Sequence, residues 1–390
     1  MGKGKLYAVG GSVPVIDLRN QFRSWMFDQA LPFWARTGID HVNGGYVEQL
    51  TLDGQDAGVA FKRTRVTARQ VYVFSHAHVL GWDGADTDHA AVGINFLVNQ
   101  TWQGPDRGFA RLVSRNGSVL DPTTDLYDHS FALFAFAWRH RARRDVESRD
   151  WMHRTLDFIE TRMDHPSGEG FWHELPPTDG RLQNPHMHLT EACLAALEST
   201  GEKRFAETAS KLVQLFQSKL LDRTTGFLPE YFTDDWRRVP GDEGRLVEPG
   251  HMMEWAWILN QARKLVGANT DDDIRGLVAL AERLGVDRSS GATYNSIRND
   301  GSALDKGSRT WPNTERIKAA IALYELDGVD PTSVISQAGG LLLSRYLARE
   351  PRGTWMDAFD EHGRNAAHVV PASTLYHVFL AFAEVLRIAD

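Results

Sequence analysis

The sequence has only one cysteine, Cys193, so no disulfide bond can form within the chain. A lone thiol fits a reducing compartment. The opening segment, Met1-Gly2-Lys3-Gly4-Lys5-Leu6, lacks the apolar stretch of a signal peptide, and no apolar run approaches the ~18 residues that cross a bilayer. We therefore expect a soluble, cytoplasmic protein with no membrane partner.

The sequence also lacks a run of lysine and arginine. Its 43 basic residues are outnumbered by 51 acidic ones, which gives a formal net charge of −8 spread along the chain. Nucleic-acid binding depends on clustered positive charge that neutralises phosphates, so we expect no nucleic-acid partner. Aromatic residues, in contrast, are abundant: 12 Trp and 19 Phe suit both a large core and a cleft in which a sugar stacks on a ring.

A glycine next to or near an aromatic residue recurs six times. Successive glycines are 63, 62, 56, 65 and 62 residues apart, and a turn dipeptide follows each after a similar interval. Because a short extended segment closed by Asp-Gly or Asn-Gly favours a hairpin, we expect a small hairpin repeated six times. The glycines are Gly45, Gly108, Gly170, Gly226, Gly291 and Gly353, and the turns are Asp53-Gly54, Asn116-Gly117, Asp179-Gly180, Asp234-Asp235, Asp300-Gly301 and His362-Gly363.

The segments between the hairpins carry the apolar spacing of buried helices. Each unit of ~60 residues has room for two helices and a hairpin, and no linker interrupts the chain. Six such units predict an all-α fold, a closed (α/α)6 barrel with short β-hairpins in its connecting loops, as a single domain over residues 1–390. The expected helices are 15–34 and, approximately, 68–81, 131–140, 189–199, 252–266, 316–326 and 374–386.

Polar residues with catalytic side chains recur shortly after each turn, where the next helix should begin. If the units surround an axis, equivalent positions converge at one end of it, and the ring gathers these groups in one cleft. Core residues without a common role would not be expected to recur at the same position of every repeat. The residues are Arg69, Asp128, His129, His188, Glu191, His251, Glu254, Glu315 and His377.

Each of these residues also has a purely structural interpretation, as a helix cap, a core hydrogen-bonding group or, for Arg69, a buried salt-bridge partner. The segment His186-Met187-His188 with Glu191 might suggest a metal site, but positions i and i+2 of a helix point apart. Neither HExxH nor a cysteine-rich set is present, so we expect no metal and no cofactor. Trp311 and Trp355 flank the polar positions and are candidates for sugar stacking.

The motifs around these residues resemble the N-acylglucosamine 2-epimerase superfamily, which includes cellobiose 2-epimerases and aldose–ketose isomerases such as mannose isomerase. The resemblance covers nearly the whole chain and implies the (α/α)6 fold, with Arg69, His188, His251, Glu254, Glu315 and His377 at active-site positions. The segment 371–376, directly before His377, is similar to that of the aldose–ketose isomerases. Asn313 stands where many relatives carry another residue. The matching segments are 43–46, 68–69, 127–131, 184–192, 249–255, 311–315 and 376–377.

These residues suit the isomerisation of an aldose to a ketose, D-mannose to D-fructose, through a cis-enediolate. Histidine changes protonation near neutral pH, so His377 is assigned as the base that moves the proton from C2 to C1, and His251 as the group that assists ring opening. Arg69 would stabilise the enediolate oxygen, while Glu254 and Glu315 orient the histidines. The candidate substrate-binding residues are His188, Asn184, Trp311, Trp355 and Asp128.

Three other functions remain open at this point. A sugar 2-epimerase would use the same histidines and return the proton to C2 from the opposite face. A glycoside hydrolase or lyase on the same fold would need a carboxylate pair as the main catalyst, whereas histidines dominate here. A helical scaffold would fit the repeats but not the phased polar groups. We expect a monosaccharide as the binding partner and a monomer or homodimer as the assembly.

Overall fold

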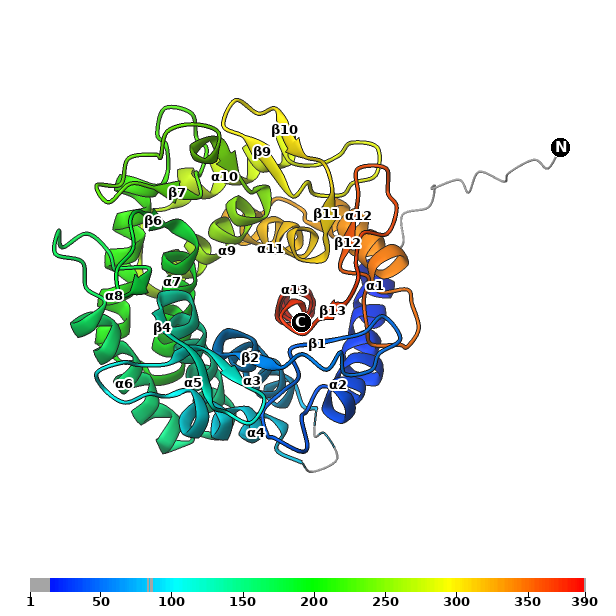
Figure 1. The fold of residues 1–390 in the computed structure, drawn as a ribbon. Helices are drawn as coiled ribbons and strands as arrows, with labels where there is room; N and C mark the ends of the chain where they lie inside the picture. Colours follow the sequence, from blue (N-terminus) through cyan, green and yellow to red (C-terminus); the bar gives the residue numbers. More distant parts are fainter. Residues whose placement is uncertain (1–14, 83, 85–86, 389–390) are drawn as a thin grey trace.

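Six helices form an inner ring around the axis of the molecule. The computed structural model describes residues 15–82, 84 and 87–388; the segment Met1–Leu6, on which the expectation about a signal peptide rests, lies outside them. Each inner helix packs against the next, and the last packs against the first (Figure 1). The inner helices are α3 (Thr64–Val79), α5 (Leu126–Arg143), α7 (Gln183–Thr200), α9 (Pro249–Val266), α11 (Thr310–Asp327) and α13 (Thr374–Ile388).

A second layer of helices surrounds the inner ring, and the apolar core lies between the layers. Phe22 of the outer layer, for example, stacks on Phe382 of α13 with ring centroids 4.0 Å apart. The double ring is the predicted (α/α)6 barrel, which is confirmed. The outer elements are α1 (Val15–Ser24), η1 (Trp25–Ala30) and α2 (Leu31–Thr37), α4 (His89–Phe96) with η3 (Leu97–Thr101), α6 (Val146–Arg162), α8 (Lys203–Leu215) with η4 (Phe216–Leu220), α10 (Asp271–Leu284), and α12 (Thr332–Leu341) with η6 (Leu342–Tyr346).

Short antiparallel strand pairs join each unit to the next at one end of the barrel. The pair formed by β13 and β1 joins the last unit to the first, so the ring closes through backbone hydrogen bonds as well as through helix packing (Figure 1). The pairs are β2 (Phe61–Arg63) with β3 (Ala110–Ser114), β4 (Val119–Asp125) with β5 (Glu174–Leu175), β6 (Arg181–Leu182) with β7 (Tyr231–Phe232), β8 (Leu246–Val247) with β9 (Ser296–Arg298), β11 (Ser308–Arg309) with β12 (Ala358–Phe359), and β13 (Val370–Pro371) with β1 (Gln49–Leu50).

Five of the six predicted turns close a hairpin or an antiparallel bridge. The second turn joins β3 to β4 and the fifth joins β9 to β10 (Ala303–Asp305), while the first, fourth and sixth lie inside bridges such as Leu50 to Asp56. The prediction of a hairpin at the third turn, Asp179-Gly180, is wrong. This turn lies between β5 and β6, which do not pair with each other: β5 pairs with β4, and β6 pairs with β7. In the third unit, both strands pair with strands of the neighbouring units, and no hairpin forms between them.

Most inner helices begin earlier than their apolar periodicity predicts. The expected start near 131, for example, lies five residues after the observed start of α5 at Leu126, and only α13 begins where expected, at Thr374. The first turns of these helices carry polar side chains that face the cleft or the neighbouring loops. Apolar spacing therefore begins about one turn inside the other five inner helices.

Two of the repeated glycines lie directly over a histidine at the start of an inner helix. Gly108 and Gly170 have φ of +64° and +74°, and a Cβ on Gly170 would lie 2.9 Å from Nε2 of His186. The same ring nitrogens accept hydrogen bonds from the backbone N–H groups that follow, at 3.0 Å from Phe109 to His129 and 3.1 Å in the third unit. The glycines thus permit loops to dock on helix-start histidines.

Asn313 performs this docking in the fifth unit. Its Oδ1 accepts from the backbone N–H of Thr293 at 2.9 Å, and its Nδ2 donates to the carbonyl of Arg309 at 2.8 Å. His129, His186 and Asn313 are therefore loop anchors. Among the described residues, no helix combines the length and apolar composition needed to span a membrane.

Candidate active site

A cleft of about 300 Å³ opens at the end of the barrel where the inner helices begin. All six inner helices or the strands before them contribute to its walls, so the phased polar positions do converge. Seven of the residues predicted for the site line the cleft, namely Arg69, Asn184, His188, His251, Glu254, Trp311 and His377. The other lining residues are Tyr127, Glu248, Arg309, Asp357, Pro371, Ser373 and Thr374.

Arg69 is held in the cleft by aromatic rings. Its guanidinium carbon lies 4.2 Å from the centroid of Phe131 and 5.2 Å from that of Tyr376, and Nη2 donates to the hydroxyl of Tyr127 at 2.6 Å. Among the described residues it forms no ion pair with a carboxylate. Stacking on aromatic faces stabilises the cation and leaves its charge available to an anionic oxygen in the cleft.

His251 is surrounded by carboxylates. Its Nδ1 lies 3.0 Å from Oε2 of Glu230 and 3.9 Å from Oε2 of Glu248. Burial alone would lower the pKa of His251, but the negative charges of Glu230 and Glu248 outweigh it and raise the pKa to about 9. The imidazole is therefore protonated at neutral pH and can donate a proton to a sugar oxygen.

His377 has the opposite electrostatic environment. Its Nδ1 lies 2.8 Å from Oε1 of Glu315 and 3.9 Å from Oε1 of Glu254. Burial, and then the positive charges of Arg69 and Lys318, hold the pKa of His377 well below its ordinary value. A neutral imidazole with Nδ1 turned to Glu315 can accept a proton at Nε2.

The indole of Trp311 lies between these two histidines. Its ring centroid is 5.0 Å from that of His251 and 5.5 Å from that of His377. The cleft therefore places a flat apolar surface between a proton donor and a proton acceptor, the arrangement that a sugar ring with polar edges requires.

His188 and Asn184 form the opposite wall on α7. Nδ1 of His188 lies 3.0 Å from Oε2 of Glu191, which also accepts from the hydroxyl of Tyr376 at 2.7 Å. Oδ1 of Asn184 is buried and has no hydrogen-bond partner among the described residues, so it can accept from a ligand hydroxyl.

Three predicted site residues do not line the cleft. Asp128 is fully buried, and its Oδ1 accepts from the backbone N–H of Arg65 at 2.8 Å, so it holds the start of α3. Trp355 is also fully buried and stacks on Trp34 with centroids 5.2 Å apart, which places it in the core and away from a sugar. Glu315 is also fully buried, and its Oε1 lies 2.8 Å from Nδ1 of His377.

The structure adds residues that the sequence analysis did not select. The hydroxyl of Tyr127 accepts a hydrogen bond from Arg69. Glu230 contacts His251, and Gln183 donates to Oε2 of the same Glu230 at 2.8 Å. A signal for Glu230 exists in the repeat, because acidic residues also follow the glycine–aromatic pairs at Glu48 and Glu174.

Two overlapping groups of side chains have ligand atoms close enough to surround an ion. They are His188, Glu191 and Glu254, and Glu254, Glu315 and His377, each within 4.8 Å of one another. A positive charge already lies beside the second group, since Nζ of Lys318 is 2.5 Å from Oε2 of Glu315. We therefore assign these carboxylates to orienting the histidines and not to holding a metal.

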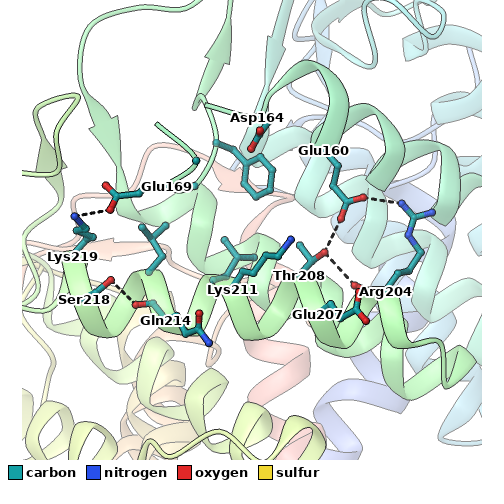
Figure 2. A pocket seen from close by; sticks show the side chains of 15 residues that line it. Glu160, Asp164, Glu169, Arg204, Glu207, Thr208, Lys211, Gln214, Ser218 and Lys219 are labelled. Carbon is teal, nitrogen blue, oxygen red and sulfur yellow. Dashed lines mark hydrogen bonds and ion pairs between the residues drawn. The ribbon is translucent and has the colours of Figure 1, made fainter. Parts of the chain in front are cut away.

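A larger hollow of about 670 Å³ lies on the outer surface between α6 and α8. Figure 2 shows two ion pairs in this hollow: Arg204 contacts Glu160 at 3.0 Å, and Lys219 contacts Glu169 at 2.8 Å. With no histidine in its wall, this hollow does not compete with the axial cleft as a centre for proton transfer.

Comparisons with known proteins agree with the fold and with a role in sugar chemistry. The sequence model of the N-acylglucosamine 2-epimerase (GlcNAc 2-epimerase) family matches residues 45–381. The chain is 35% identical to the mannose-6-phosphate isomerase of Rhizobium meliloti (strain 1021), with 93% of this chain and 95% of that protein covered. It is 28% identical to the D-mannose isomerase of Thermobifida fusca, with 88% of each covered. The solved cellobiose 2-epimerase of Spirochaeta thermophila DSM 6192 superposes with a TM-score of 0.86 at 24% identity, covering 96% of this chain and 98% of that one.

Proposed function

Because the chain belongs to the N-acylglucosamine 2-epimerase family, whose members here are sugar isomerases and epimerases, we propose that it is an aldose–ketose isomerase that interconverts D-mannose and D-fructose. The observation that carries this proposal is the placement of two histidines with opposite electrostatic surroundings in one cleft: the carboxylates of Glu230 and Glu248 raise the pKa of His251, whereas burial and neighbouring positive charges lower that of His377. Isomerisation needs both an acid and a base at the same substrate.

The reaction would proceed through a cis-enediolate. With the sugar ring opened by proton transfer from His251, Nε2 of His377 removes the proton from C2, and the electron pair forms a C1–C2 double bond as the aldehyde oxygen becomes negative. Arg69 stabilises that oxygen. Transfer of the O2 proton to the negative O1, together with return of the proton from Nε2 of His377 to C1, turns the C2–O2 bond into a carbonyl and gives the ketose.

The lining of the cleft favours an unphosphorylated sugar. Its three carboxylates, from Glu248, Glu254 and Asp357, balance the positive charges of Arg69, Arg309 and His251, so the cleft offers no surplus positive charge to a phosphate dianion. Arg309 at the rim is already 3.3 Å from Oε2 of Glu248. The relative named mannose-6-phosphate isomerase makes the phosphorylated sugar the necessary comparison.

A sugar 2-epimerase is the second candidate, supported by the position of both histidines on either side of Trp311. If His251 could also reach C2, the enediolate would be reprotonated there and would give the epimeric aldose.

The test is to incubate the purified protein separately with mannose, fructose, glucose, cellobiose, N-acetylglucosamine and mannose 6-phosphate and to follow products by NMR. We expect fructose from mannose, and mannose from fructose, at a higher kcat/KM than with mannose 6-phosphate. Glucose from mannose without any ketose would establish the epimerase instead.

A further inference from the structure

Lys318 is a fully buried lysine about two helical turns beyond Trp311, which lines the cleft. It lies on α11 three residues after Glu315, and its exposed fraction is 0%. Its Nζ is 2.5 Å from Oε2 of Glu315 and 3.8 Å from Oε1 of Glu254, and it stands 4.5 Å from the ring centroid of Trp257. Burial of an ammonium group is unfavourable unless the charge is paired, so Lys318 needs the carboxylates of Glu315 and Glu254 beside it.

The carboxylates near Lys318 have few other partners. Both oxygens of Glu254 and Oε2 of Glu315 are buried without a hydrogen-bond partner among the described residues. Both carboxylates and Nδ1 of His377 lie within 4.8 Å of one another. Two buried acids at this separation repel each other when both are ionised, and a positive charge must balance them.

We propose that Lys318 is a positioning residue for His377: its ammonium group supplies the positive charge that lets the Glu254–Glu315 pair remain negative beside Nδ1 of that histidine. This inference rests on the proposed function of His377 as the base. A negative Glu315 accepts the Nδ1 proton, which fixes the tautomer that leaves the Nε2 lone pair free. It also stabilises the imidazolium that forms when Nε2 takes the C2 proton.

The charges around the cluster agree with this role. Burial, followed by the charge of Glu254, raises the pKa of Glu315, and Lys318 opposes that rise. Without Lys318 the pKa of Glu315 would rise further, so a smaller share of this carboxyl would be ionised at any given pH. The other titratable or charged groups that face the cluster are Glu191 and His188 on α7, His251 on α9, Arg69 on α3 and Tyr376 on α13.

The test compares Lys318→Met with Lys62→Met. Lys62 is a similarly buried lysine, 1% exposed and 3.0 Å from Oδ2 of Asp40, but it lies on β2 and does not line the cleft. In Lys318→Met we expect kcat at pH 7 to fall about tenfold or more with little change in KM. Activity should recover as pH rises, because the acid limb of the kcat profile moves to higher pH. Lys62→Met should lose thermal stability and keep the wild-type pH profile.

A substrate-free measurement separates this inference from the proposed function. The ¹⁵N NMR shifts of the His377 ring in the wild-type protein should report a proton on Nδ1 and none on Nε2 at pH 7, and Lys318→Met should change that tautomer. An unaltered tautomer together with a kcat loss that is uniform in pH would overturn the role of Lys318, whatever sugar the enzyme uses. Lack of activity in the wild type toward every sugar, with the expected tautomer change, would instead count against the function alone.

A second variant covers the case in which Lys318→Met does not fold. The double variant Lys318→Met/Glu254→Gln removes one charge of each sign. If charge balance is the role of Lys318, the double variant should regain the cooperative thermal transition that the single variant lacks. Failure of both variants to fold would show that the lysine is needed for packing and would overturn the proposal.

Discussion

Oε2 of Glu230 lies 3.0 Å from Nδ1 of His251, although 21 residues separate them in the chain. Glu230 belongs to the loop that leads from the repeated glycine to β7, and it reaches His251 because β7 docks beside β6 at the mouth of the cleft. The protonated state of His251 therefore depends on a loop residue and not only on its own helix.

The first prediction is that Glu230→Gln moves the alkaline limb of the kcat profile to lower pH. The pKa of His251 is raised above its ordinary 6.5 to about 9, so the acid form persists to about that pH. Loss of the negative charge should lower this pKa by about a unit or more. A kcat–pH profile checks it, with Glu207→Gln, an exposed acid on the outer helix α8, as the control that leaves the profile unchanged.

The same pair gives a signed effect on stability. A group whose pKa is raised on folding contributes stability that is fully present below its unfolded pKa and is lost as pH rises through the folded pKa. The difference in Tm between wild type and Glu230→Gln should accordingly be largest below pH 6.5 and should shrink toward pH 9. A Tm difference that is constant from pH 6 to 10 would contradict the assignment of charge to His251.

The second prediction separates Arg69 from a structural arginine. Arg69→Met should keep the fold, since its neighbours are aromatic rings, and should lose roughly 10²–10³ in kcat, the usual effect of removing one oxyanion partner. Arg316→Met is the matched control on α11, because Arg316 is 5% exposed and pairs with Glu282 at 2.6 Å. It should lower Tm and leave kcat per folded molecule near normal. Circular dichroism and steady-state kinetics measure both; near-normal turnover in Arg69→Met would contradict its role.

The fold could be predicted from the sequence because its signals are local and repeated. Each glycine–aromatic pair and each turn dipeptide marks the same point of a unit, so six weak signals reinforce one another. The third turn failed because the partners of β5 and β6 belong to other units. Strand pairing across units depends on the closed ring, which a local dipeptide does not encode.

The site could be predicted only in part. The repeat predicts which residues stand near the start of each inner helix, but it does not predict whether their side chains point into the cleft. His186 and His188 are two residues apart at the start of α7; the first anchors a loop at Phe171 and the second faces the cleft. Asp128 shares the predicted phase and turns instead to the backbone of Arg65. Glu230 lies outside the helices and its role depends on loop docking.

The third prediction concerns the two tryptophans proposed to stack on sugar. Trp311 lies between the histidines, so Trp311→Leu should raise KM about tenfold or more through loss of the stacking surface. Trp355 packs on Trp34 in the core, so Trp355→Leu should lower Tm with KM unchanged. Calorimetry and initial-rate kinetics on both variants check the difference, and a KM effect from Trp355→Leu alone would reverse the assignment.

The fourth prediction is that activity needs no divalent ion. The acidic cluster of Glu254 and Glu315 has Lys318 as its counter-charge, and an ion placed there would meet a buried ammonium group. Dialysis against EDTA should leave kcat unchanged. Loss of activity on dialysis, restored by a single divalent metal, would show that the carboxylates bind that metal in the working enzyme.

The last prediction separates the two histidines by isotope exchange. If His377 carries the proton between C2 and C1, isomerisation of mannose in D₂O should place some deuterium at C1 of fructose and should also retain some of the original proton by direct transfer. His377→Asn should abolish both, since Asn approximates the shape of the ring but cannot titrate. His251→Asn should slow ring opening yet still permit slow exchange at C2, because the neutral base remains beside Glu315. NMR and mass spectrometry of recovered sugars distinguish the outcomes. Exchange that survives in His377→Asn and disappears in His251→Asn would make His251 the base, and deuterium at C2 of an epimeric aldose without ketose would identify an epimerase.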